Sequence, residues 1–145
     1  VPDTKLYIVG SSPRDEIVQL AADENVVVTG YVDDLVPYYA RCTVFVAPLL
    51  TGGGMIIKIL NAMAMGKPVV TTSIGNEGVD ATADEEIIIA DTPEEFARRT
   101  VQLLTDAELR QSLGQKGRLF LERNYSWESI IERLERVYED LVGEV

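Results

Sequence analysis

The hydrophobic positions of the chain fall into five short runs. These are KLYIV at 5–9, VVVT at 26–29, TVFVA at 43–47, PVVTT at 68–72 and EIII at 86–89. Strands that are buried on both faces of a parallel sheet have this nearly unbroken apolar character. Because segments with helical spacing separate most of the runs, the pattern predicts an α/β fold, a doubly wound, Rossmann-like parallel sheet followed by a helical C-terminal segment.

Helix-capping signals mark the starts of several intervening segments. Ser12 followed by Pro13 predicts the start of a helix that ends near residue 22. The segments Thr92–Glu95 and Thr105–Glu108 each fit a capping box, in which a hydroxyl residue is followed three positions later by glutamate. They predict two consecutive helices after the last strand.

The C-terminal third is predicted to be helical throughout. Gly114 and Gly117 weaken its first long helix and are able to break it. Ser126 is expected to cap the last helix, with Tyr125 and Trp127 anchoring it to its neighbour. The apolar residues of the last helix form one stripe at helical spacing: Ile130, Ile131, Leu134, Val137, Tyr138 and Leu141.

A glycine-rich loop precedes the most apolar helix. Thr51-Gly52-Gly53-Gly54 leads directly into MIIKILNAMAM at 55–65. Consecutive glycines let backbone N–H groups approach a ligand closely, and a helix N-terminus favours a phosphate through its unpaired donors and its dipole. The alternative is a flexible linker with no ligand.

Lys58 and Asn61 are the polar residues of that helix, and they share a face. Since the helix is apolar almost all round, it is predicted to be buried on most sides, where polar groups need partners. A bound anion would also offset the unfavourable position of a lysine near a helix N-terminus. The alternative is a lysine that extends to water and an asparagine bonded to the backbone.

Composition and charge exclude several classes of function. The chain has 145 residues, 46% hydrophobic and 26% charged, which fits one globular domain at 1–145. Its net charge of −11 argues against nucleic-acid binding. The absence of histidine excludes catalytic triads that need it and zinc sites with histidine ligands. A single cysteine excludes an internal disulfide.

The negative charge is unevenly distributed. Residues 1–73 carry seven acids and five bases, a net of −2, whereas residues 74–145 carry 17 acids and eight bases, a net of −9. Residues 35–76 contain no acid at all. This stretch includes the glycine-rich loop, so the local charge is compatible with a phosphorylated ligand, although buried elements also dilute charge.

Three common phosphate-binding patterns do not fit. The P-loop pattern fails because Ile57 and Ile59 flank Lys58 where a glycine and a hydroxyl residue are required. The dinucleotide-binding pattern fails because Ile57 stands at the third glycine position. A phospho-receiver domain would need an aspartate where Ala47 ends the third strand.

The stretch VFVAPLLTGGGMIIKILNAMAMGKPVVTTSIGNEG resembles the donor half of group 1 (family 4) glycosyltransferases, which have the GT-B architecture. The resemblance extends to KLYIVGSSP, VVVTGYVDDLVPYYARC, DTPEEFARRTVQLLTDAELRQSLGQKGR and the closing YSWESI, and so covers nearly the whole chain. It implies a domain that binds a nucleotide-sugar, in an enzyme that retains the anomeric configuration.

The resemblance also implies roles for individual residues. The backbone at residues 30–32 would hold the base, and the backbone at residues 52–56 the phosphates and the sugar. Lys58 would stabilise the phosphates and is the one catalytic candidate. With the loops at the carboxyl ends of the predicted strands, the substrate-binding set is Gly10, Gly30, Tyr31, Val32, Thr51, Gly52, Gly53, Gly54, Met55, Ile56, Lys58, Asn61 and Glu77.

Two positions depart from the family pattern. The resemblance implies one glutamate that contacts the donor sugar and another, eight positions later, that contacts the ribose hydroxyls. Gly53 and Asn61 stand there instead. An asparagine amide can hydrogen-bond a hydroxyl, but without the assistance of a charge. A catalytically degenerate binding module of the same fold is therefore one alternative, and a GT-B nucleotide-sugar epimerase is another.

The resemblance implies that the chain is a fragment. It would lack the family's first βα unit and the N-terminal acceptor domain, and we expect it to be inactive alone. The parent is expected to transfer a hexose-type sugar to a glycan, lipid or other acceptor. Its partner would be a nucleotide-diphosphate sugar, without metal or other cofactor. We expect a cytoplasmic protein that contacts the membrane face only through the missing half.

Overall fold

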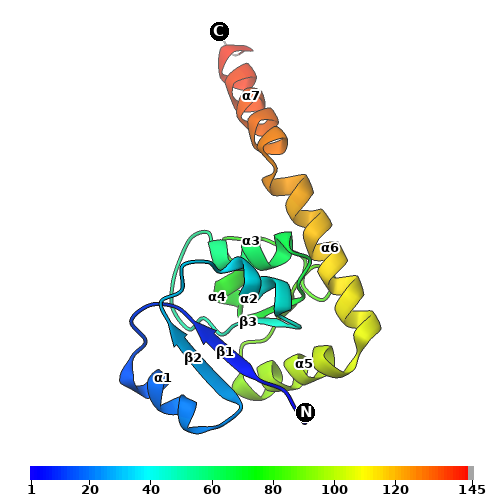
Figure 1. Cartoon of the computed structure of the whole chain (residues 1–145). Helices are drawn as coiled ribbons and strands as arrows, with labels where there is room; N and C mark the ends of the chain where they lie inside the picture. The colour runs from blue at the N-terminus through cyan, green and yellow to red at the C-terminus, as the bar shows by residue number, and fades with distance from the viewer. Residues whose placement is uncertain (144–145) are drawn as a thin grey trace. The chain divides into compact units, whose positions relative to one another are not determined.

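The computed structural model describes residues 1–143 of the chain. It contains two compact units, Val1–Arg41 and Cys42–Val145, each with its own parallel sheet and helices (Figure 1). The predicted parallel α/β architecture is confirmed. Within residues 1–143, none of the helices combines the length and the apolar character needed to cross a membrane.

The first unit is built on two parallel strands. Its elements in order are β1 (Leu6–Val9), α1 (Asp15–Gln19), the 3-10 helix η1 (Leu20–Ala22), β2 (Val26–Gly30) and α2 (Val36–Arg41). β1 and β2 begin in register at Leu6 and Val26. The rings of Tyr7 and Tyr38 pack edge to face with their centroids 6.4 Å apart. None of residues 1–41 is buried, so this small unit has no closed core of its own.

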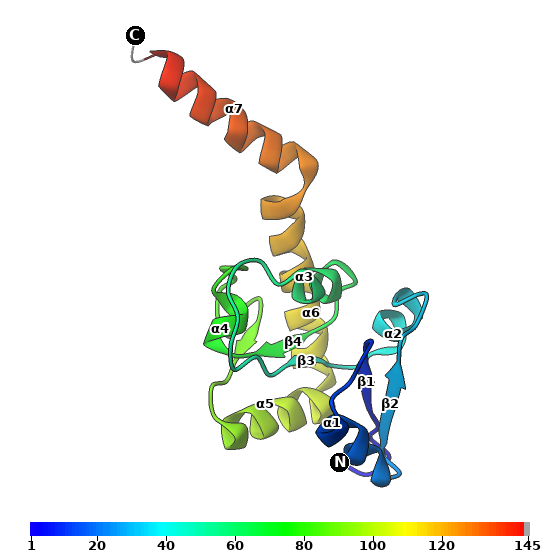
Figure 2. The ribbon, with the colours of Figure 1, turned by 90° about the vertical axis from the view of Figure 1, so that its left-hand side faces the viewer.

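The second unit carries the larger sheet. Its elements are β3 (Phe45–Ala47), α3 (Ile57–Ala64), β4 (Val69–Thr71), α4 (Ser73–Asn76), β5 (Ile88–Ile89), α5 (Pro93–Thr105), α6 (Ala107–Tyr125) and α7 (Trp127–Gly143). The strands are parallel in the order β3-β4-β5. α3 and α5 lie on opposite faces of this sheet (Figures 1 and 2).

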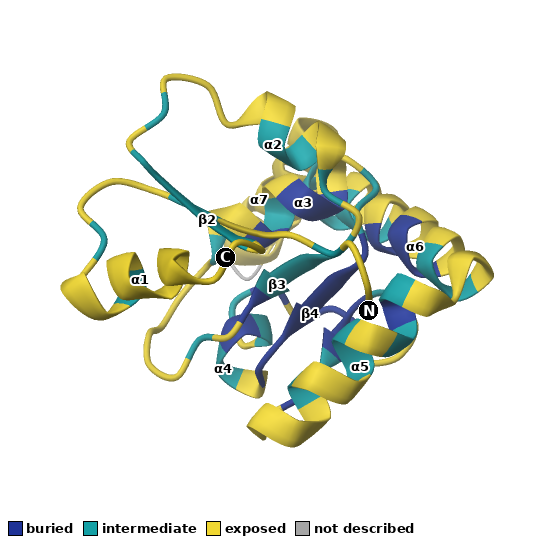
Figure 3. Cartoon of the chain, turned by 60° about the horizontal axis from the view of Figure 1, so that its bottom comes forward, coloured by how far each residue is buried: buried dark blue, intermediate teal, exposed yellow. Residues whose placement is uncertain are grey.

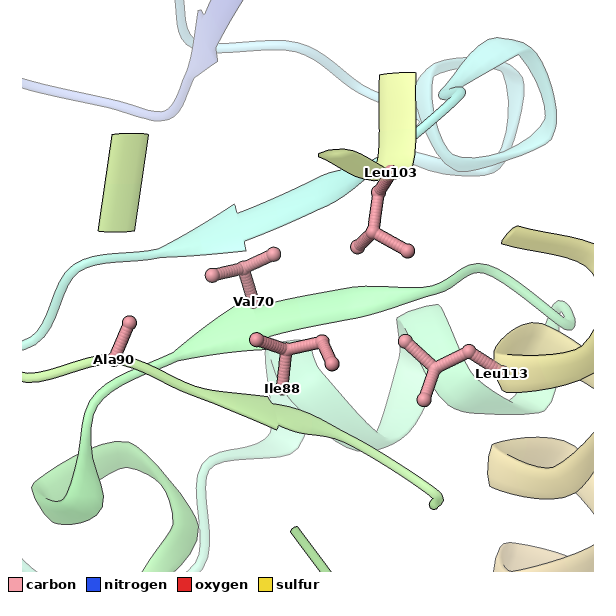
Figure 4. Close-up of a cluster of buried hydrophobic side chains, with 5 residues drawn as sticks. All are labelled: Val70, Ile88, Ala90, Leu103 and Leu113. Atoms are coloured by element: carbon pink, nitrogen blue, oxygen red, sulfur yellow. The ribbon is translucent and has the colours of Figure 1, made fainter. Parts of the chain in front are cut away.

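The core of the second unit lies between the sheet, α5 and α6. β4 is buried along its whole length (Figure 3), as expected for the central strand of a parallel sheet. Val70 and Ile88 on neighbouring strands are covered by Leu103 of α5 and Leu113 of α6 (Figure 4). On the other face, α3 buries a stripe of three residues: Ile59, Ala62 and Met63.

Two predicted helix caps are wrong. Ser12 adopts a left-handed conformation (φ 52°), and α1 begins only at Asp15, without a side-chain cap. α6 is capped by Asp106, which accepts a hydrogen bond of 2.9 Å from the N–H of Leu109. The neighbouring Thr105 instead donates its hydroxyl to the carbonyl of Val101 within α5. The caps at Thr92 and Ser126 are confirmed.

The two glycines of α6 do not break the helix. A Cβ atom on Gly114 would lie 2.2 Å from the carbonyl oxygen of Gly66, and one on Gly117 would lie 2.8 Å from that of Glu86. Both glycines therefore allow α6 to pack closely against the backbone at Gly66 and Glu86. This close packing explains why glycine stands at both positions despite its low helix propensity.

The last helix is less anchored than the sequence suggests. Tyr125 is the last residue of α6, and its hydroxyl donates to the carbonyl of Val79 at 2.8 Å, so it anchors the end of α6 rather than α7. The side chain of Trp127 is 77% exposed, and none of the described residues of α7 is buried. The apolar stripe of α7 lies on the surface of this chain.

Candidate functional site: a glycine-rich loop at the carboxyl edge of the sheet

Three loops of the second unit meet at the carboxyl edge of β3, β4 and β5. They follow β3 at residues 48–56, β4 at residues 72–78 and β5 at residues 90–92. Because parallel strands bring their carboxyl ends to one edge of a sheet, such loops commonly form ligand sites in α/β proteins. Three contacts described below connect them.

The first loop is held at its beginning by Thr72. The hydroxyl of this residue donates to the carbonyl of Leu49 at 2.6 Å. Next to it, the buried hydroxyl of Thr71 donates to the carbonyl of Ala47 at 2.9 Å. These hydroxyls at the end of β4 fix the direction in which the chain leaves β3.

The same loop is held at its end by Gly78. A Cβ atom on Gly78 would lie 2.2 Å from the carbonyl oxygen of Gly54 and 2.7 Å from the nitrogen of Met55. Gly78 thus lets two backbone segments touch. Gly54 itself has φ 76°, a conformation that favours glycine. The glycine-rich loop is therefore supported at both ends, which argues against the flexible-linker alternative.

The loop leads into the uncapped N-terminus of α3. Ile56 stands at the cap position and provides no side-chain hydrogen bond to the first turn of this helix. The N–H groups at such a terminus lack partners within the helix and carry partial positive charge. No heavy atom lies within 4 Å of a Cβ built on Gly52 or Gly53. The loop and the helix start therefore offer open space beside a group of backbone donors.

Lys58 and Asn61 lie on the exposed side of α3. The expectation that they are buried is wrong, because α3 buries only the stripe that faces the sheet and α6. Lys58 is in the first turn and Asn61 is one turn further along. Because both side chains are exposed to solvent, both are able to contact a bound ligand. Met55 and Ile57 beside them are more than half exposed.

Glu77 lies directly beside the supported loop. It is exposed, follows the last residue of α4 and precedes the glycine that touches Gly54. The side chain of Asn76 both donates to and accepts from the backbone of Ala81, at 2.9 and 3.2 Å, which closes the turn after Glu77. The structure thus brings Thr51, Gly52, Gly53, Gly54, Met55, Ile56, Lys58 and Glu77 to one region of the second unit.

The remaining predicted residues lie in the first unit. Gly10 follows β1 and Gly30 is the last residue of β2, and the N–H of Gly10 donates to the carbonyl of Gly30 at 3.2 Å. The ring of Tyr31 is 75% exposed and Val32 is half-buried. These four residues form one edge of the smaller sheet.

Asp91 is a site residue that the sequence analysis missed. Its carboxylate accepts hydrogen bonds from the N–H and the hydroxyl of Ser73, at 2.7 and 2.6 Å. These bonds hold the pKa of Asp91 below its ordinary value of 3.8. Asp91 therefore supports the start of α4 and joins the third loop to the second. The only sequence signal is its place after β5.

We expect Asp91→Asn to lower the free energy of unfolding at neutral pH. The variant should also change how that free energy depends on pH in the acid range. Since the folded state lowers this pKa, the ionised carboxylate stabilises the fold above 3.8, and that contribution is lost as the pH falls through the lowered value. The difference in unfolding free energy between wild type and variant should shrink on acidification, as measured by urea denaturation. Asp140→Asn, an equal charge change on α7, should show no such convergence.

Comparison with known proteins assigns the chain to a family. Residues 1–106 match the family described as glycosyl transferases group 1. The chain belongs to this family. It is 28% identical to the capsular polysaccharide biosynthesis glycosyltransferase CapM of Staphylococcus aureus, over 98% of this chain and 39% of that protein. It thus spans about two fifths of the length of such curated relatives.

Solved structures place this group 1 glycosyltransferase chain in the GT-B architecture. It is similar to Anabaena HepE in complex with UDP, with a TM-score of 0.81, 16% identity, and coverage of 97% of this chain and 42% of that one. It is also similar to the C-terminal domain of LpcC from Francisella tularensis, with a TM-score of 0.73, 22% identity, and coverage of 87% and 72%. These likenesses show the fold.

Proposed function

We propose that this chain is the part of a retaining group 1 glycosyltransferase that binds the nucleotide-diphosphate sugar. The observation that carries the proposal is the glycine-rich loop, held at both ends and leading into an uncapped helix N-terminus beside Lys58. A diphosphate would complete this arrangement, since it accepts hydrogen bonds from backbone N–H groups and neutralises the lysine. The UDP complex of HepE supports the ligand class.

The proposed chemistry is largely electrostatic. As the bond from the sugar to the diphosphate breaks, negative charge grows on the leaving phosphate. Donors that are already in place stabilise such charge without reorganisation. The N–H groups at residues 52–57 and the ammonium of Lys58 would act in this way, with no metal required. Glu77 would contact the sugar or the nucleotide, and the backbone at residues 30–32 the base.

Lys58→Gln is expected to weaken binding of the nucleotide diphosphate about tenfold. A charge-assisted hydrogen bond contributes about 1.5–3 kcal/mol, and tenfold corresponds to about 1.4 kcal/mol. The measurement is calorimetric titration of the full-length protein that carries this chain with UDP, GDP and ADP sugars. Lys116→Gln, the same substitution on an exposed turn of α6, is the control. Equal affinities for both variants would argue against the assignment of Lys58.

Asn61 gives a specific reason to consider a second candidate. Its amide lacks the charge that the family pattern places at the ribose contact, so the parent could be a degenerate binding or structural module. Failure of every nucleotide-sugar to bind would favour that alternative. Asn61→Glu should tighten binding if the residue faces the ribose, and unchanged affinity would count against that role. A GT-B epimerase would instead convert its nucleotide-sugar without an acceptor.

We also propose that the chain alone is inactive. Detectable transfer of a sugar by the chain alone would refute this proposal.

A further inference from the structure

A pocket lies at the edge of the β3-β4-β5 sheet opposite to the glycine-rich loop. It has a volume of about 460 Å³ and is formed by residues 42–43, residues 66–68 and one face of α6. Residues 42–43 precede β3 and residues 66–68 precede β4, so the pocket is at the amino edge of these strands. The glycine-rich loop follows the carboxyl end of β3. The two sites are therefore distinct, and an inference about this pocket is independent of the proposed function.

The turn that forms one wall of the pocket is rigidly held. The N–H of Gly66 donates to the carbonyl of Met63, and the N–H of Lys67 donates to that of Ala62, both at 2.9 Å. These bonds close the C-terminus of α3 in the manner of a Schellman cap. On the other side, Gly114 of α6 approaches the carbonyl of Gly66 so closely that a Cβ atom would not fit.

The facing wall presents Arg110 in a fixed position. Its Nη1 donates to the carbonyl oxygens of Leu103 and Leu104, at 2.8 and 3.2 Å, at the end of α5. A guanidinium carries five N–H donors in a planar fork. Within residues 1–143, those of Nε and Nη2 have no hydrogen-bond partner. Gln111, also in the lining, adds a neutral amide on the same face of the helix.

The lining is positive in a chain that is strongly negative overall. Lys67 and Arg110 both line the pocket, and no carboxylate does. α6 begins at the pocket with Ala107, where the carboxylate of Asp106 already caps its N-terminus, so the positive charge of the lining comes from the two side chains. The nearest acids in sequence, Asp106 and Glu108, are outside the lining. Two cations and neutral donors around a space of this size suit an anion of phosphate dimensions better than an apolar ligand.

We propose that this pocket binds a phosphate group, either as free phosphate or as the monoester of a small molecule. Arg110 would donate through its fork, Lys67 would supply a point charge, and the hydroxyl of Thr43 and the amide of Gln111 would complete the contacts. The site is open to water, so the affinity is expected to be millimolar and sensitive to salt.

Cys42 provides a built-in probe. It is the only cysteine of the chain and lines the pocket. Burial raises the pKa of its thiol, while the charge of Lys67 acts in the opposite direction. A bound phosphate would cover the thiol and counter the charge of Lys67, and both effects disfavour the reactive thiolate. Phosphate should therefore slow alkylation of Cys42 by iodoacetamide several-fold and in a saturable way.

The experiment measures the rate at which iodoacetamide alkylates Cys42, at one pH and at increasing concentrations of sodium phosphate. Sodium chloride holds the ionic strength constant. Glycerol 3-phosphate forms a second arm. Protection by it at lower concentration would identify a monoester, and protection by phosphate alone would identify the free ion. UDP binding to the full-length protein should be unchanged by the pocket substitutions, so failure here is distinguishable from failure of the proposed function.

Two variants test the residues. Lys67→Gln should remove most of the protection, measured as the ratio of rates with and without phosphate so that its direct effect on the thiol cancels. Gln111→Glu places a carboxylate in the lining and should abolish protection without touching the bonds of Arg110. Lys116→Gln, outside the lining, should retain it. Absence of saturable protection in the wild type, or equal protection in Gln111→Glu, would overturn the proposal.

Discussion

Leu103→Ala should lower the free energy of unfolding by about 2–5 kcal/mol, the range measured for removing a fully buried leucine side chain. Leu103 is completely buried where α5 covers Val70 and Ile88, and these form one cluster with Leu113. Alanine at this position would leave a cavity between the helix and the sheet, because the sheet is fixed by its ladder and cannot collapse into the space. Urea denaturation followed by circular dichroism measures the change, with the slope of the transition compared between the proteins.

The matched control is Leu134→Ala. It makes the same chemical change on α7, where Leu134 is 51% exposed, and it should alter the unfolding free energy by less than about 0.5 kcal/mol. The contrast tests whether the apolar stripe of α7 is outside the core of this chain. An equal loss in both variants would mean that the stripe is packed in solution and that the core is wrongly placed.

The parallel α/β architecture could be predicted because each strand is a local apolar run. Two local caps, at Thr92 and Ser126, were equally predictable. The prediction failed at α6, because Thr105 turned its hydroxyl back into α5 and left Asp106 to cap α6. Which of two neighbouring side chains caps a helix depends on the angle at which the chain enters it.

The features that hold the site together are non-local and were not visible in the sequence. α4 is a single turn whose start is held by Asp91, 18 residues away, and no local pattern indicates such a partner. The glycine-rich loop itself could be recognised from consecutive glycines. Its support could not, because the role of Gly78 rests on a distance to Gly54 that only the folded chain defines.

The burial of Lys58 was mispredicted for a similar reason. The periodicity showed a helix with apolar residues on nearly every side. It does not tell on which of these sides other elements of the fold pack. α3 is covered only where it faces the sheet and α6, so Ile57 remains 66% exposed beside Lys58.

Gly78→Ala should disrupt the candidate site by forcing apart the two loops that meet at Gly78. The added carbon would lie 2.2 Å from the carbonyl oxygen of Gly54, and both neighbours are backbone that cannot rotate away. Overpacking of this kind costs about 1–3 kcal/mol of stability. The loop must also move away from α4, which changes the directions of its N–H groups. We therefore expect nucleotide-diphosphate affinity to fall by more than tenfold, beyond about 1.4 kcal/mol.

The two effects are measured separately in the full-length protein. Urea denaturation gives the loss of stability, and calorimetric titration with the nucleotide-sugar, at a temperature where the variant is folded, gives the loss of affinity. Gly143→Ala is the control, since no atom lies within 4 Å of its added carbon and it is remote in sequence from the loop. Destabilisation with unchanged affinity would show that Gly78 supports the fold but does not shape the loop for its ligand. Loss of affinity in the folded variant, with the control unaffected, would place the diphosphate on the backbone that Gly78 holds.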